Sequence, residues 1–139
     1  MVQIISGEKG KGKTKYLLDK ANQAIKESTG SVVYLDKSSK HMYELNNKIR
    51  LINVNEYPVA SSEAFIGFIC GIISQDHDLE MMFFDSFLKL SCLEGEDISD
   101  IVSTFEKLGE KYHVTFVLSV SRDKDKLPEN AQKDVIISL

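Results

Sequence analysis

The feature that most constrains this chain is a segment rich in glycine and lysine at residues 7–14, which reads Gly-Glu-Lys-Gly-Lys-Gly-Lys-Thr. It fits the pattern GxxxxGK followed by Ser or Thr at every fixed position. The residue usage of this chain gives such a match by chance in only about 0.6% of sequences. An apolar run, Val2 to Ser6, precedes the segment and a helical pattern follows it. The segment is therefore predicted to form the turn between a buried strand and a helix.

Each fixed position of this segment has a physical reason. Glycines let the backbone fold around phosphate groups, and the following helix adds the positive end of its dipole. We expect Lys13 to reach the β- and γ-phosphates of a nucleoside triphosphate and Thr14 to place its hydroxyl on Mg²⁺. Lys9, Lys11 and Lys15 are expected to be solvated side chains that raise the local potential. The predicted nucleotide-binding residues are Gly7, Glu8, Lys9, Gly10, Lys11, Gly12, Lys13, Thr14 and Lys15.

Short apolar runs alternate with segments of helical periodicity along the whole chain. This alternation predicts a three-layer α/β/α fold with a mainly parallel sheet, because parallel neighbouring strands need a crossover that a helix usually supplies. A chain of 139 residues has the length of one such domain, residues 1–139. The expected strands are Val2 to Ser6, Ser31 to Asp36, Ile49 to Val54, Leu79 to Phe84, Val114 to Val120 and Val135 to Leu139.

Three helices are expected between these strands. The first follows the glycine-rich segment and is expected to end at Gly30 through a positive φ angle. The second begins with Ser61 or Ser62 as its cap and contains the apolar stretch Ala64 to Ile73, interpreted as a buried helix. The third contains Ile98 to Leu108 on an amphipathic pattern.

A second motif lies at residues 81–85, where four apolar residues end in a carboxylate, Met-Met-Phe-Phe-Asp. A buried strand is expected to carry Asp85 to the carboxyl edge of the sheet, beside Thr14. There its charge can hold Mg²⁺, usually through water. Thr14 and Asp85 are thus the predicted metal-binding residues.

With both motifs in place, the chain resembles P-loop NTPases, and within them the RecA-like group, over most of its length as a bare core. It is also similar to small uncharacterised bacterial ATP-binding proteins, some of which carry the label twitching-motility ATPase. A motor's additional domain has no room in 139 residues. The resemblance implies ATP and Mg²⁺ as cofactors and Lys13 and Asp85 as catalytic residues.

The chain departs from this family in one respect. RecA-like ATPases usually keep a glutamate just after the second strand to polarise the attacking water, and other members keep it directly after the aspartate that follows the apolar run. Here these places hold Asp36 and Ser86. Without a glutamate there, general-base help is lost, which implies slow hydrolysis. Asp36 is a third catalytic candidate as its substitute; the alternative is that Asp36 caps a following helix with Ser38 or Ser39.

Three polar residues end the strand that precedes the charged segment near residue 123. Ser119 or Ser121 can sense a γ-phosphate at the sheet edge, or can simply be polar strand-end residues. Arg122 can act as an arginine finger on a neighbouring subunit, or can be a solvated loop residue. The three histidines show no ligand spacing and are expected at the surface or at strand edges: His41, His77 and His113.

Charge and composition exclude several classes of protein. A net charge of −4 and a pI near 5.4 argue against a broad basic face, so binding to nucleic acid or anionic membrane is not expected. Cys70 and Cys92 lack the spacing of a zinc site. The longest apolar stretch falls well short of the roughly 20 residues that span a bilayer. A reducing cytoplasm is the expected compartment.

These observations predict an ATP-binding protein with slow ATPase activity, acting as a nucleotide-dependent switch or a partner ATPase. A protein partner or a second copy of the chain can complete its site. The alternatives are a small-molecule kinase, although only Arg50 and Arg122 are available to clamp phosphates, and a nucleotide-binding scaffold that does not hydrolyse. ATP is preferred over GTP because no NKxD-type guanine motif is present.

Overall fold

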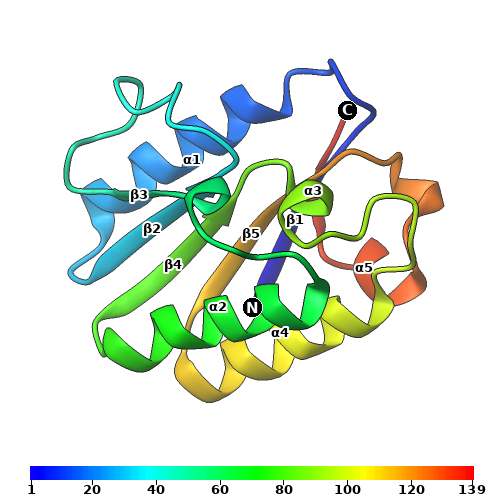
Figure 1. The fold of residues 1–139 in the computed structure, drawn as a ribbon. Coiled ribbons are helices and arrows are strands. Elements are labelled where there is room, and N and C mark those ends of the chain that lie inside the picture. Colours follow the sequence, from blue (N-terminus) through cyan, green and yellow to red (C-terminus); the bar gives the residue numbers. More distant parts are fainter.

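The computed structural model describes all 139 residues and contains one six-stranded, all-parallel sheet in the order β3-β2-β4-β5-β1-β6. Helices cover both faces of this sheet (Figure 1). The predicted three-layer α/β/α fold is therefore confirmed. The strands are β1 (Val2–Ser6), β2 (Ser31–Asp36), β3 (Arg50–Asn53), β4 (Leu79–Phe84), β5 (Thr115–Val120) and β6 (Val135–Ser138).

One long helix covers one face and two cover the other. Helix α1 (Lys13–Glu27) lies on the first face, and α2 (Ser62–Gln75) and α4 (Ser99–Tyr112) lie on the second (Figure 1). No helix combines the length and apolar character that crossing a membrane requires. Four single-turn elements were not predicted, because they are too short to show a period: η1 (Val54–Glu56), α3 (Phe87–Leu90), η2 (Lys124–Lys126) and α5 (Glu129–Gln132).

The alternation of side chains along the central strands sets which residues meet α1. Tyr34, Phe83 and Val117 belong to the apolar cluster on the α1 face. Residues two positions further along a strand point to the same face. Asp36, Asp85 and Ser119, at or next to the ends of β2, β4 and β5, therefore lie on the α1 side. The two faces thus receive different groups at the carboxyl edge of the sheet.

Three local expectations were wrong. Helix α1 ends at Glu27 and not at Gly30, which lacks a positive φ angle; a Cβ atom on Gly30 would lie 2.0 Å from the carbonyl oxygen of Asp78. Glycine is needed there for close approach of two backbones.

Helix α2 is buried on only one face, since Gly67 and Gly71 face open space. Its cap is Ser61, whose hydroxyl accepts a hydrogen bond from the Ala64 amide at 3.1 Å, as predicted.

The third error concerns the segment after β2. Residues 37–49 form a series of turns and no helix, so Asp36 caps nothing. The segment is held against the α1 face by Leu45 and Ile49, which are buried in the cluster of that face. Asn22 of α1 also donates from its side chain to the backbone oxygen of Glu44 at 2.8 Å. The turns therefore bring residues 37–44 close to the carboxyl ends of the strands.

Candidate functional site

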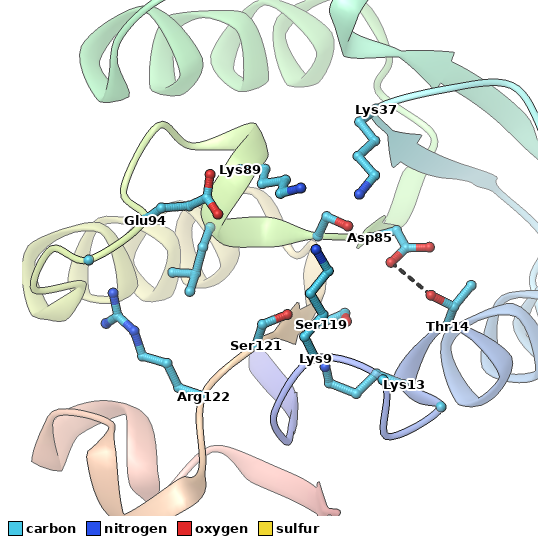
Figure 2. A pocket seen from close by; sticks show the side chains of 15 residues that line it. Lys9, Lys13, Thr14, Lys37, Asp85, Lys89, Glu94, Ser119, Ser121 and Arg122 are labelled. Atoms are coloured by element: carbon cyan, nitrogen blue, oxygen red, sulfur yellow. Dashed lines mark hydrogen bonds between the residues drawn. The ribbon is translucent and has the colours of Figure 1, made fainter.

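A cleft of about 570 Å³ opens at the carboxyl edge of the sheet, above β1, β4 and β5 (Figure 2). Of the 15 residues that line it, Leu88 is the only hydrophobic one. Five residues of the predicted loop are in the lining, whereas Gly7, Glu8, Lys11 and Lys15 are not. The lining residues are Lys9, Gly10, Gly12, Lys13, Thr14, Lys37, Asp85, Ser86, Leu88, Lys89, Glu94, Gly95, Ser119, Ser121 and Arg122.

The loop between β1 and α1 keeps backbone N–H groups available to a ligand. Gly10 and Gly12 both have φ angles of 88°, which side chains with a Cβ atom rarely adopt. Gly12 is also the N-cap residue of α1. It supplies no side-chain hydrogen bond, so the amides of the first helical turn have no capping partner. The Gly7 amide donates to Val120 and Arg122, and the Lys11 amide to Glu8. The remaining loop amides and the helix terminus form a group of donors suited to an anion.

Lys13 lies across this loop and is only 7% exposed. Its Nζ atom donates a hydrogen bond to the backbone oxygen of Glu8 at 3.1 Å. Burial lowers the pKa of the Lys13 ammonium group, and the charges of Asp85 and Glu8 oppose that change. An anionic ligand in the loop favours the charged form of Lys13 in the same way.

The structure brings Asp85 and Thr14 together across 71 positions of sequence. The Thr14 hydroxyl donates to Oδ1 of Asp85 at 3.2 Å, and the Tyr34 hydroxyl donates to Oδ2 at 3.1 Å. Asp85 is 4% exposed and Tyr34 is fully buried. Burial, followed by the negative charge of Asp85, raises the pKa of Tyr34, so Tyr34 stays a hydrogen-bond donor. Both carboxylate oxygens are thus held in place by hydroxyl groups.

Asp36 ends β2, the strand next to β4, and is not among the residues that line the cleft. Its Oδ1 atom accepts from the Lys37 amide at 2.7 Å, whereas its buried Oδ2 atom has no hydrogen-bond partner. Burial, followed by the charge of Asp85, raises the pKa of the Asp36 carboxyl group. One of the three predicted catalytic residues is therefore buried and does not line the cleft.

Two lysines of the cleft were not predicted from the sequence. Lys37 and Lys89 project into it from the side opposite the glycine loop (Figure 2). Burial, followed by the neighbouring ammonium group of Lys89, lowers the pKa of Lys37. Two ammonium groups held close together repel each other, and an anion between them relieves that repulsion. The position of Lys37 directly after β2 could have indicated that it reaches the cleft. Lys89 lies on the short helix α3, which no sequence pattern indicated.

Ser119, Ser121 and Arg122 all reach the cleft, as the end of β5 lies between the strands that carry the loop and Asp85. Ser119 is almost fully buried, whereas Ser121 is exposed. The Arg122 guanidinium donates to the backbone oxygen of Leu93 at 3.3 Å. Arg122 thereby contacts the segment that contributes Glu94, a cleft carboxylate that the sequence did not suggest.

The charges around the cleft favour an anionic ligand. Five cationic side chains line it, against two carboxylates, in a chain whose net charge is −4. Positive charge is thus concentrated at one place on an acidic protein. The five cations are Lys9, Lys13, Lys37, Lys89 and Arg122. No protein-family model and no curated protein matches this chain, so the residues of the cleft are the guide to its chemistry.

Proposed function

We propose that this cleft binds ATP with Mg²⁺ in the manner of a P-loop NTPase and hydrolyses it slowly. The observation that supports this most strongly is the 3.2 Å contact between the Thr14 hydroxyl and Asp85. It pairs a magnesium-binding hydroxyl and a carboxylate at the mouth of a loop with free amides and a buried lysine. Oxygen ligands of this kind, few in number, suit Mg²⁺ bound to a polyphosphate.

Each group around the cleft has a part in this proposal. The amides of the loop and the terminus of α1 hold the α- and β-phosphates, and Lys13 leaves the Glu8 carbonyl to reach the β- and γ-phosphates. Thr14 and Asp85 hold Mg²⁺, directly or through water. Lys37 and Lys89 face the γ-phosphate from the opposite side and stabilise charge that develops on it.

The cleft recognises the phosphates more than the base. Leu88 is its only hydrophobic residue, whereas a purine ring is usually held by apolar or aromatic surfaces. The base therefore extends beyond the cleft, where a protein partner or a second copy of the chain can contact it. A preference for ATP over GTP rests on the sequence, which lacks a guanine-binding motif.

Slow hydrolysis follows from the carboxylates that the cleft offers. Asp85 is engaged by Thr14 and Tyr34, and Asp36 is buried outside the lining. Glu94 is the remaining cleft carboxylate and lies on the segment between α3 and α4. Asp36 and Ser86 thus occupy the places of a water-polarising glutamate, which suits a switch that stays in its ATP-bound form in the cytoplasm.

The test is direct titration of the protein with Mg²⁺-ATP by calorimetry. Lys13→Ala is expected to weaken binding by at least about 100-fold, or about 2.8 kcal/mol, because it removes a charge-assisted contact to two phosphates. Lys26→Ala is the matched control, since Lys26 is exposed in the last turn of α1, outside the cleft lining. An affinity unchanged in Lys13→Ala, with circular dichroism showing a folded protein, contradicts the proposal.

Phosphoryl transfer to an anionic acceptor is a second candidate, favoured by the pair of lysines opposite the loop. Lys37 and Lys89 can hold an acceptor's negative charge as well as a γ-phosphate. Phosphate release measured alone and with small anionic acceptors separates the two functions. Steady release alone supports the ATPase, acceptor-dependent turnover supports the kinase, and binding without turnover identifies a scaffold.

A further inference from the structure

A second group of ligand-type side chains lies beside the cleft and includes a histidine from the turns after β2. One ligand atom each from Asp36, His41 and Asp85 lies within 4.8 Å of the others. Three atoms bound in a plane to one metal ion at about 2.1 Å are about 3.6 Å apart. Shifts of up to about 0.7 Å per atom therefore suffice to bring all three atoms onto a single ion.

The carboxylates of this group are buried, and one oxygen has no partner. Asp36 is 1% exposed, and its Oδ2 atom makes no hydrogen bond. Burying an ionised carboxylate next to a second one is costly unless a cation or hydrogen bonds compensate. The oxygens of Asp85 each accept one hydroxyl hydrogen bond and retain a lone pair for a metal.

His41 contacts a carboxylate of its own turn segment through one ring nitrogen. Its side chain is 18% exposed, and its Nδ1 atom lies 3.0 Å from Oε1 of Glu44. When Nδ1 donates to this carboxylate, Nε2 keeps its lone pair for a metal ion. Contacts of this kind fix the ring and raise its basicity in many metal sites.

We propose that Asp36, His41 and Asp85 bind one divalent transition-metal ion next to the nucleotide cleft. A mixed set of two carboxylates and one imidazole suits Mn²⁺, Fe²⁺, Co²⁺ or Zn²⁺ better than Mg²⁺, which favours oxygen ligands alone. Three protein ligands leave positions open for water, as in sites where the metal takes part in chemistry. The site needs no nucleotide. It shares Asp85 with the Mg²⁺ site proposed above, whereas Asp36 and His41 belong to the transition-metal site alone.

The experiment titrates the full chain, stripped with a chelator and free of nucleotide, with Co²⁺ and with Mn²⁺. Visible absorption reports the ligand field of Co²⁺, and the electron paramagnetic resonance signal reports free Mn²⁺. We expect one ion per chain. His41→Asn and Asp36→Asn should each weaken binding by more than about 10-fold, and Glu44→Gln by about 10-fold, as for other orienting contacts.

Two further variants make the result specific. His77→Asn, which changes an exposed histidine at the end of α2, should leave metal binding unchanged. Lys13→Ala should keep the transition metal while it loses Mg²⁺-ATP, so failure of one proposal is distinguishable from failure of the other. Absence of Co²⁺ binding, or binding of equal strength in folded His41→Asn and Asp36→Asn proteins, overturns the metal site.

Discussion

The two faces of the sheet bury different kinds of side chain. On the side of α2 and α4, a cluster of 26 buried residues is apolar throughout and includes five phenylalanines. On the side of α1, the cluster has 10 residues and borders buried polar groups at the carboxyl edge of the sheet. Helix α1 packs on the smaller cluster, and helices α2 and α4 pack on the larger one (Figure 1). The α1 face thus carries the buried groups Asp36, Asp85 and Ser119, and the other face holds the larger apolar cluster.

The phenylalanine cluster explains how the α1 face can carry groups that cost stability. The rings of Phe105 and Phe116 lie 4.7 Å apart between centroids, and those of Phe105 and Phe84 lie 5.4 Å apart. Packing of this kind adds to the free energy gained by burial. Across the sheet, Asp36 is buried with an unpartnered oxygen, a cost that functional sites often carry. The comparison leads to three predictions on the free energy of unfolding.

The largest effect is expected from a truncation on the apolar face. Phe105→Ala should lower the free energy of unfolding by about 3–5 kcal/mol, because it opens a cavity among fully buried rings. Urea unfolding measures this change, and calorimetry on the folded fraction should find an unaltered affinity for Mg²⁺-ATP. Tyr112→Ala, on the exposed side of the same helix, is the control. A loss of affinity for Mg²⁺-ATP in folded Phe105→Ala protein would contradict the idea that the apolar face acts on stability alone.

A smaller effect is expected from a polar contact on the α1 face. Tyr34→Phe removes the hydroxyl that donates to Asp85 at 3.1 Å and leaves a buried carboxylate oxygen without that partner. The free energy of unfolding should fall by about 1–3 kcal/mol. Affinity for Mg²⁺-ATP should fall as well, which distinguishes this variant from Phe105→Ala. The matched variant Tyr16→Phe, on exposed α1 surface, should change neither quantity.

The smallest effect is a pH dependence of the free energy of unfolding, and it comes from Asp134, which contacts Glu106 of α4. Burial, followed by the hydrogen bond and charge of Glu106, raises the pKa of Asp134 from its ordinary value of 3.8 to about 6. The folded state therefore binds this proton more tightly, so its stabilising contribution is complete below pH 3.8 and is lost as pH rises through 6. This loss should lower the free energy of unfolding by about 1 kcal/mol, a value reduced by solvent screening, and Asp134→Asn should abolish it.

Urea unfolding between pH 4 and pH 7 checks the Asp134 prediction, with Asp123→Asn as the control. Asp134→Asn should gain stability relative to the natural chain as pH rises across this range. If the free energy of unfolding depends on pH in the same way in Asp134→Asn and in the natural chain, other groups cause the dependence and the prediction is wrong. Nucleotide binding at pH 7 should stay the same in Asp134→Asn, because this residue is not part of the cleft lining.

Much of the fold followed from local patterns. All six strands and the three long helices were predicted, with ends shifted by a few residues. The turns of residues 37–49 were mistaken for the start of a helix, because Asp36 and Ser38 are equally suited to turns and to caps. Gly30 was assigned a positive φ angle, since only the tertiary structure shows the Asp78 carbonyl beside it.

The candidate site was predicted in part. The loop residues and Asp85 were named from motifs, and the structure places Thr14 and Asp85 in contact. Tyr34, Lys89 and His41 were missed as partners of these groups. Tyr34 looks like any core residue of a strand, and His41 has no ligand spacing in sequence. Their roles depend on neighbours that lie far away along the chain.

The sequence by itself determined the glycine-rich turn and the strands, because turn chemistry and short apolar runs are local properties. Only the tertiary structure decided that β2 lies beside β4, so that the Asp85 amide bonds to the Leu35 oxygen and Tyr34 reaches the Asp85 carboxylate. It also decided that the turns after β2 fold back to bring His41 near two aspartates. Strand order and the path of a long loop are set by packing between distant segments, which no local pattern records.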